Sequence, residues 1–296
     1  PLPFAPAPFP IEVTPMAEPI TLSAGRSGRA LPAVAEALLR DAGGVIMSRY
    51  QTTLDVRFKG RGDLVTEVDH AVDHLITGAL TEEYPDWGIM SEESEGRSSD
   101  SGYEWIIDPI DGTKNFAMSV PLFAVNLALA KDGVVVFGMT YDPVHDELFA
   151  ASRGGGCTLN GRPAQVGDRQ TVPDAVACYG VGYELERAKH LLDFLHGLWP
   201  NVQSLRDLGT AALALAWVAC GRYDLYLHQA FSPWDFAPGL VLVTEAGGVV
   251  SERDGRPVPL RYAGRVRTNA TGIVADRKST RLNSSHIPLS RMPSSA

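Results

Sequence analysis

The sequence predicts an α+β or α/β fold in which mixed sheets are flanked by helices. Apolar residues recur at helical spacing in residues 31–50 and 68–76. Three β-rich segments separated by turns follow at residues 123–130, 134–141 and 147–151. From Ala175 onward, strands alternate with helices, a pattern typical of α/β layers. We therefore expect an N-terminal α+β lobe at residues 16–174 and a C-terminal α/β lobe at residues 175–275.

The composition is that of a globular enzyme. Hydrophobic residues make up 45% of the 296 residues and charged residues make up 21%, which suits one large domain or two modest ones. No uninterrupted apolar run reaches the roughly 18 residues that a membrane span needs. No basic segment followed by an apolar core forms a secretory signal. We therefore expect a cytoplasmic protein that does not enter a membrane.

The net charge and the cysteines exclude further classes of protein. A formal charge of −9 argues against a nucleic-acid partner and suits a site that collects divalent cations. The cysteines, Cys157, Cys178 and Cys220, are widely spaced and lie in apolar or glycine-rich surroundings. This spacing argues against a disulfide framework or a zinc site, so we expect reduced thiols.

The two ends of the chain are set apart from the predicted fold. Residues 1–15 are dense in proline and are expected to be a flexible extension, with translation beginning at Met16. The string DRKSTRLNSSH, residues 276–286, back-translates to a sequencing-adapter sequence. We therefore expect residues 276–296 to be adapter read-through rather than native sequence. The alternative is a disordered native tail.

Candidate functional residues accompany the second helical segment, whereas the first is expected to be scaffold. Residues 31–50 predict an amphipathic scaffold helix. In KGRGDLVTEVDHAVDHLI, residues 59–76, Asp63 and Thr66 precede the helical pattern, and one interpretation is that they only cap the helix. Asp69 is expected to lie beyond the first-turn positions, so capping does not account for it.

The segment WGIMSEES, residues 87–94, predicts a short buried strand that runs out into two glutamates, Glu92 and Glu93. Taken alone, it is equally well interpreted as a charged loop.

The segment YEWIIDPIDGTKNF, residues 103–116, carries the densest signal for chemistry. A buried strand is expected to end at Ile107, and Asp108, the Ile110 carbonyl and Asp111 can then point the same way because Pro109 donates no hydrogen bond. Gly112 allows a sharp turn, and the residue after it opens a short helix whose free N–H groups would face an anion. An EF-hand is excluded by the ligand spacing. A simple Asp-Gly turn is the alternative.

The rest of the chain supplies further candidates. RGGGCTLNGRP, residues 153–163, lacks the lysine of a phosphate loop, and its Asn160-Gly161 step predicts a β-hairpin. Gly209, Thr210 and Ala211 open an apolar helix, and Asp235 follows Trp234 at the start of another. Helix capping is the alternative interpretation for both sites.

DPIDGTKNF matches, position for position, the signature of the inositol monophosphatase family of magnesium-dependent, lithium-sensitive phosphatases. The DLVTxxD block, the SEES segment with Ser91 in place of the usual glycine, the GTA step and the Trp-Asp pair are similar to further family blocks in the same order. The resemblance covers roughly residues 31–275.

This resemblance implies an αβαβα layered sandwich and a metal-dependent phosphatase with two or three Mg²⁺ ions. It assigns the metal ligands to Glu92, Asp108, the Ile110 carbonyl, Asp111 and Asp235. It assigns water activation to Asp69 and Thr113, with Glu92 counted among the catalytic residues. It makes Glu93 and Thr66 supporting residues around the ligands.

On the substrate side, the resemblance implies that the N–H groups of Gly112 and Thr113 hold phosphate. It places Gly209, Thr210, Ala211, His228 and Asp235 against substrate hydroxyl groups. His228 stands where animal-type members carry a glutamate, so we expect loosened specificity. The alternative is that His228 ends a strand and faces solvent.

The expected substrate is a small sugar or polyol phosphate, first of all inositol monophosphate, and a homodimer is expected. Histidinol phosphate, fructose 1,6-bisphosphate and 3′-phosphoadenosine nucleotides are the alternative substrates. A catalytically idle, phosphate-binding regulatory member of the fold is the non-enzyme alternative.

Overall fold

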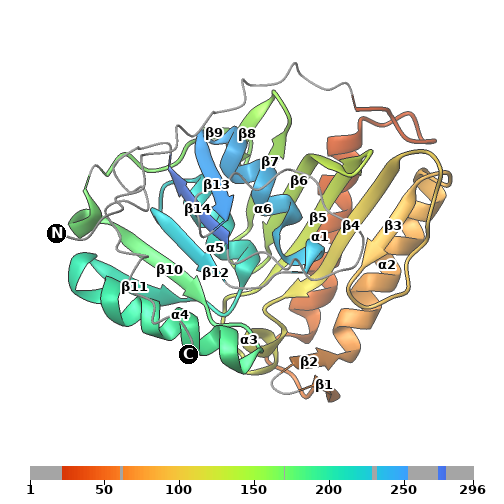
Figure 1. The fold of residues 1–296 in the computed structure, drawn as a ribbon. Helices are drawn as coiled ribbons and strands as arrows, with labels where there is room; N and C mark the ends of the chain where they lie inside the picture. Colours follow the sequence, from red (N-terminus) through yellow and green to blue (C-terminus); the bar gives the residue numbers. More distant parts are fainter. Residues whose placement is uncertain (1–21, 61–62, 170, 229–231, 253–272, 278–296) are drawn as a thin grey trace.

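The computed structural model describes residues 22–60, 63–169, 171–228, 232–252 and 273–277. Within these ranges the chain forms two large sheets, a small hairpin and helices on several levels (Figure 1). Residues 1–15 and residues 278–296 lie outside the described ranges, so the predictions for them are untested. No helix in the described ranges is long and apolar enough to cross a membrane.

The first large sheet has the strand order β3-β4-β5-β6-β7-β8-β9. Its strands are β3 (Gly88–Ser91), β4 (Tyr103–Asp111), β5 (Ala124–Lys131), β6 (Val134–Asp142), β7 (Glu147–Ser152), β8 (Gly156–Leu159) and β9 (Arg162–Ala164). β3 runs parallel to β4, and every later neighbour is antiparallel. The predicted meander is confirmed. The predicted hairpin is also confirmed, since Asn160 and Gly161 have φ of 48° and 72°, as a type I′ turn requires.

Two helices, α1 (Leu31–Arg49) and α2 (Glu67–Glu83), cover one face of this sheet. Trp105 and Ile107 of β4 pack in the same core cluster as these helices. Ile106, between them in the chain, points to the other face because side chains alternate along a strand. A hairpin of β1 (Val56–Gly60) and β2 (Asp63–Thr66) leads into α2.

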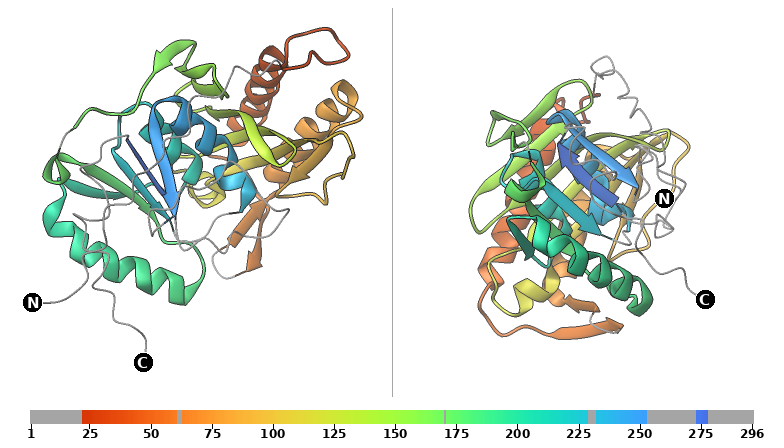
Figure 2. Two further views of the ribbon diagram at one scale, coloured as in Figure 1. Left: turned by 45° about the horizontal axis from the view of Figure 1, so that its top comes forward. Right: turned by 60° about the vertical axis from the view of Figure 1, so that its left-hand side comes forward.

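The opposite face of the first sheet packs against α5 (Ala211–Ala219) and α6 (Pro233–Glu245). These helices also contact the second sheet, so they form a central layer between the two sheets (Figure 2). Their sequences are apolar around most of the helix, as burial on two sides demands. Gly138 of β6 allows close approach, because a Cβ there would lie 2.7 Å from Val241 of α6.

The second sheet has the order β11-β10-β12-β14-β13. Its strands are β10 (Val176–Gly180), β11 (Ser204–Asp207), β12 (Leu225–His228), β13 (Gly248–Glu252) and β14 (Ile273–Arg277). β11, β10 and β12 are parallel, whereas β14 is antiparallel to both of its neighbours. α4 (Leu185–Leu198) covers the outer face of this sheet. The helix, sheet, helix, sheet, helix succession confirms the predicted layered sandwich.

The boundary between the two sheets and the end of β14 can be compared with the limits expected for the two lobes. The two large sheets divide the chain between Ala164 and Val176, close to the expected lobe boundary, and short 3₁₀ turns lie at Val172–Asp174 and Trp199–Asn201. At the other end, β14 continues through Asp276 and Arg277, whose backbones pair with β13. The last strand thus crosses the expected end of native sequence by two residues.

Candidate active site

β4 delivers two carboxylates to one side of the sheet. The strand was expected to end at Ile107, and that prediction is wrong, because β4 continues to Asp111. Its register with β5 shifts between Asp108 and Asp111, and such an irregularity re-aims side chains. Pro109 is tolerated inside the strand because the ladder is already interrupted there. The Ile110 N–H donates to Asp108 Oδ1 at 3.1 Å and helps to hold that carboxylate.

A third carboxylate comes from the first turn of α6. Asp108, Asp111 and Asp235 each offer an oxygen atom, and these atoms lie within 4.8 Å of one another. Asp235 is not the N-cap of α6. It is the third helical residue, and it accepts a hydrogen bond from the N–H of the capping residue Ser232 at 2.8 Å. Three converging carboxylates form an all-oxygen donor set of the kind that Mg²⁺ prefers.

The cluster is electrostatically strained in the absence of cations. Burial, together with repulsion from Glu92, Asp111 and Asp235, raises the pKa of Asp108 well above its usual value. Burial also raises the pKa of Asp111 to about 6, even though hydrogen bonds to its carboxylate oppose the shift. Bound cations would relieve this repulsion, so the donor set fits a divalent metal.

Glu92 and Glu93 follow β3, as predicted, but a cation from the β1–β2 hairpin holds them. Lys59 Nζ lies 2.9 Å from Glu92 Oε1 and also forms an ion pair with Glu93. Burial raises the pKa of Glu92 and that of Glu93, the latter to about 7, while Lys59 opposes both shifts. Glu92 is outside the three-carboxylate group but close enough to be the largest source of repulsion on Asp108.

The predicted pair Asp69 and Thr113 is brought together beside the carboxylates. Thr113 Oγ1 lies 3.0 Å from Asp69 Oδ1 and 2.9 Å from the Ile110 carbonyl oxygen, so its one proton can go to either acceptor. The expectation that Asp69 lies beyond the first turn is wrong. It is the third residue of α2 and forms a capping box with Thr66, whose N–H donates to Asp69 Oδ2 at 2.9 Å.

Burial raises the pKa of Asp69, and the hydrogen bonds from Thr66 and Thr113 oppose that shift. The carboxylate is 1% exposed, so these hydrogen bonds fix its orientation inside the protein. Asp63, the other suggested cap, lies in β2 and pairs with Gly60 instead.

The GTA step forms the opposite wall of the site. Thr210 is the N-cap of α5, and its hydroxyl donates to Asp111 Oδ2, which also accepts the Ala212 N–H at 2.8 Å. Thr210 thus positions Asp111. Gly209 and Ala211 line the same pocket as Thr210.

Gly112 lies at the turn between β4 and α3 (Thr113–Ala117), with φ of 91°. A Cβ at this position would lie 3.0 Å from the Leu122 carbonyl oxygen. The residue therefore needs glycine both for its backbone conformation and for close approach.

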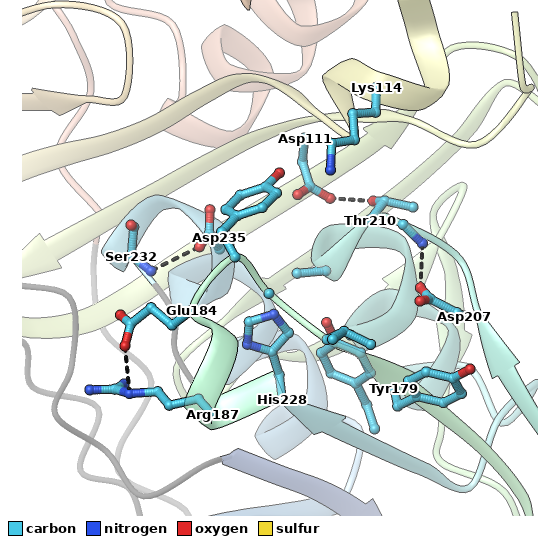
Figure 3. A pocket seen from close by; sticks show the side chains of 17 residues that line it. Asp111, Lys114, Tyr179, Glu184, Arg187, Asp207, Thr210, His228, Ser232 and Asp235 are labelled. Carbon is cyan, nitrogen blue, oxygen red and sulfur yellow. Dashed lines mark hydrogen bonds and ion pairs between the residues drawn. The ribbon is translucent and has the colours of Figure 1, made fainter. Parts of the chain in front are cut away.

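The carboxylates open into a pocket of about 260 Å³ (Figure 3). Asp111 and Lys114 lie at one end of it, and His228 lies across from them. His228 ends β12 and lines the pocket. Its ring packs against Gly180, where an added Cβ would lie 2.5 Å from His228 Cδ2. The pocket is also lined by Tyr179, Gly182, Tyr183, Glu184, Arg187, Asp207 and Tyr226.

Sequence reasoning missed most of the further residues that line the pocket, and it also missed Lys59 beside the carboxylates. Lys59, Lys114 and Tyr183 carry no local pattern that marks them, because each acquires its place through contacts with a distant segment. Only the position of Lys114 directly after Thr113 could have drawn attention to it.

Comparisons with known proteins show what the chain is similar to. A model of the inositol monophosphatase family matches residues 29–288. An inositol-1-monophosphatase of Mesorhizobium japonicum is 42% identical over 205 residues, which cover 68% of this chain and 77% of that protein. The Nus factor SuhB of Pseudomonas aeruginosa is 39% identical over 224 residues, covering 73% of this chain and 83% of that protein.

Among solved structures, the extragenic suppressor protein suhB from Bartonella henselae superposes with a TM-score of 0.81 at 32% sequence identity. The superposition covers 88% of this chain and 99% of that one. The similarity therefore extends over the whole layered fold.

Proposed function

Because the chain belongs to the inositol monophosphatase family, we propose that it is a Mg²⁺-dependent phosphomonoesterase acting on a small sugar or polyol phosphate. Inositol monophosphate is the first substrate to test. The observation that carries this proposal is the convergence of Asp108, Asp111 and Asp235 within 4.8 Å, beside the 3.0 Å contact between Thr113 and Asp69.

In this proposal the metal would be held by the three clustered carboxylates, by Glu92 once Lys59 releases it, and by the Ile110 carbonyl. Bound Mg²⁺ supplies charge stabilisation for the phosphate and lowers the pKa of a water molecule. The ions number two or three, as expected from the resemblance.

The residues of the chain then handle the proton and the orientation. Asp69, held by Thr66, accepts the hydroxyl proton of Thr113, whose oxygen in turn accepts the proton of the attacking water. The N–H groups of Gly112 and Thr113, at the start of α3, would hold phosphate oxygens. The leaving group lies toward Gly209, Ala211 and His228, which line the same pocket.

A catalytically idle, regulatory role is the competing proposal, and some relatives are named Nus factor SuhB rather than inositol monophosphatase. The retained contact between Thr113 and Asp69 disfavours it, because a phosphate-binding protein has no need of a proton acceptor beside its cation site. We further propose inhibition by lithium and a homodimer, as the family resemblance implies, and a cytoplasmic location.

The test is phosphate release from a panel of phosphomonoesters at saturating Mg²⁺ and again in excess EDTA. The panel contains inositol 1-phosphate, histidinol phosphate, fructose 1,6-bisphosphate and 3′-phosphoadenosine 5′-phosphate. We expect release from at least the inositol ester, its loss in EDTA and its recovery on adding Mg²⁺. Asp111→Asn should abolish the metal-dependent activity, while Asp168→Asn, outside the pocket, serves as the matched control. Undiminished turnover in EDTA would contradict the proposal.

A further inference from the structure

Lys114 brings a positive charge to a pocket otherwise rich in carboxylates. It is the second residue of α3, directly after Thr113, and its side chain lines the pocket together with Asp111 and Asp235. Figure 3 shows the ammonium end turned toward the interior of the pocket. Among the described residues, no carboxylate oxygen lies within the 4.0 Å of an ion pair with this ammonium.

The carboxylates that line the pocket have other partners, and Asp235 accepts the N–H of Ser232 at 2.8 Å. Asp111 accepts a hydrogen bond from Thr210. Glu184 forms an ion pair with Arg187 at 2.9 Å. Asp207 accepts the N–H of Gly209 at 2.9 Å. Because no ion pair among the described residues neutralises the Lys114 ammonium, its charge is available to a ligand.

Tyr183 fixes where that charge lies. Lys114 Nζ lies 4.6 Å from the centroid of the Tyr183 ring. Tyr183 belongs to the loop between β10 and α4, so the contact joins the two sides of the pocket. A cation over an aromatic face is held in place without being neutralised, so it can still attract an anion.

Lys114 shares one end of the pocket with Asp111, and its ammonium extends from there over the Tyr183 ring, toward the leaving-group side. The phosphoryl group belongs beside Thr113 and the three clustered carboxylates, at the start of α3. The Lys114 side chain extends from there to Tyr183, the neighbour of Gly182 in the chain. Gly182 lies close to His228, since a Cβ added to it would be 3.5 Å from His228 Cε1. Gly182 and His228 line the pocket, in the part that would receive the alcohol portion of a substrate under the proposed function.

We propose that Lys114, held over Tyr183, binds a second anionic group, a phosphate or a carboxylate, on the leaving-group portion of the substrate. The enzyme accordingly favours phosphomonoesters that carry a second negative charge over matched esters that lack one. This inference rests on the proposed phosphatase function and narrows its substrate class.

Two matched substrate pairs test the proposal: fructose 1,6-bisphosphate against fructose 1-phosphate, and 2-phosphoglycerate against glycerol 2-phosphate. In Lys114→Met, which removes the charge and keeps the length, the kcat/KM ratio within each pair should fall about tenfold, as expected for one charge-assisted contact. Lys114→Arg should restore most of the ratio. Lys131→Met is the matched control, because Lys131 lies 4.0 Å over the Tyr103 ring but outside the pocket.

Two kinetic outcomes overturn the proposal. If kcat/KM of both members of a pair is unchanged in Lys114→Met, Lys114 does not contact the substrate. An equal fall for both members of a pair means that Lys114 contacts only the phosphoryl group under attack. Melting temperatures of all variants, measured in parallel, identify any loss caused by misfolding.

A binding measurement separates this inference from the proposed function. The measurement uses the Asp69→Asn variant with Mg²⁺, in which the proposed proton acceptor is absent. Calorimetric titration then gives the affinities for fructose 1,6-bisphosphate and fructose 1-phosphate without requiring turnover. Adding Lys114→Met should weaken binding of the bisphosphate about tenfold more than binding of the monophosphate. Equal weakening overturns the role of Lys114. Absence of phosphate release by the wild-type protein overturns the phosphatase function instead. The ratio of the affinities for the bisphosphate and the monophosphate still tests whether Lys114 binds a second anionic group.

Discussion

The Thr113 hydroxyl lies 3.0 Å from the Asp69 carboxylate, although 44 positions separate the two residues in the chain. The contact joins the first turn of α3 to the first turn of α2, and both partners are oriented by further hydrogen bonds. In the proposed mechanism this contact serves proton transfer, whereas the clustered carboxylates bind cations.

Removing this contact should damage the chemical step more than metal binding. Thr113→Ala should lower kcat roughly 10²-fold, the low end of what a positioned proton acceptor contributes. The Mg²⁺ concentration for half-maximal activity should change little. Thr113→Ser keeps the hydroxyl and should retain most of the activity. A Thr113→Ala variant with full kcat would show that the hydroxyl plays no part in activating water.

Mg²⁺ should stabilise the folded protein by relieving repulsion among Asp108, Asp111 and Asp235. A ligand at 100 times its Kd contributes about 2.7 kcal/mol per site, so the melting temperature should rise with the logarithm of the Mg²⁺ concentration. Asp108→Asn removes one buried charge, and should raise the melting temperature of the metal-free protein while reducing the Mg²⁺ response. The idea fails if Asp108→Asn destabilises the metal-free protein and leaves the response intact.

The metal-free protein should lose stability as the pH rises from about 4 to about 7. The usual carboxyl pKa in an unfolded chain is about 4, whereas the folded pKa is about 6 for Asp111 and about 7 for Glu93. The folded state therefore binds more protons across this window, so the free energy of unfolding falls with rising pH.

Urea denaturation in EDTA between pH 5 and pH 8 measures this dependence, and the same series at saturating Mg²⁺ is the control. With the carboxylates occupied by cations, the decline should vanish or reverse, because protons then compete with the metal. Stability of the metal-free protein that rises with pH across the window would contradict the prediction.

His228 should loosen selection among polyol phosphates. A neutral imidazole accepts one hydrogen bond and brings no negative charge, so inositol 1-phosphate should compete with other small sugar phosphates within roughly tenfold in kcat/KM, about 1.4 kcal/mol. His228→Glu should shift the ratio toward inositol 1-phosphate and toward the cationic ester histidinol phosphate. Unchanged ratios across the panel would mean that His228 does not contact the substrate.

Much of the fold could be predicted because its signals are local. The meander and the Asn160-Gly161 turn follow from alternation and turn chemistry, and the structure has them where the sequence placed them. The end of β4 was missed because Asp108 and Pro109 ordinarily disfavour a strand. Pairing with β5 overrides that preference beyond the irregularity.

The site was only partly accessible to sequence reasoning. Asp108 and Asp111 share one motif, and the family resemblance supplied Asp235, which the structure places beside them. The ion pairs of Lys59 with Glu92 and Glu93 depend on how the β1–β2 hairpin lies against the end of β3. No periodicity in the chain encodes such a contact. The same holds for the approach of Tyr183 to Lys114.

The contact between Gly180 and His228 couples the substitutions that these two positions tolerate. An alanine at 180 collides with the imidazole, whose Cδ2 lies 2.5 Å from the added Cβ. A shorter side chain at 228 would remove that collision, and only the tip of the Tyr226 side chain, its hydroxyl 2.9 Å from the added Cβ, would then have to shift. A substitution of Gly180 that is harmful alone can thus become acceptable when position 228 carries a shorter side chain. Libraries intended to alter substrate choice should randomise both positions at once, since scanning one at a time would discard the useful combinations.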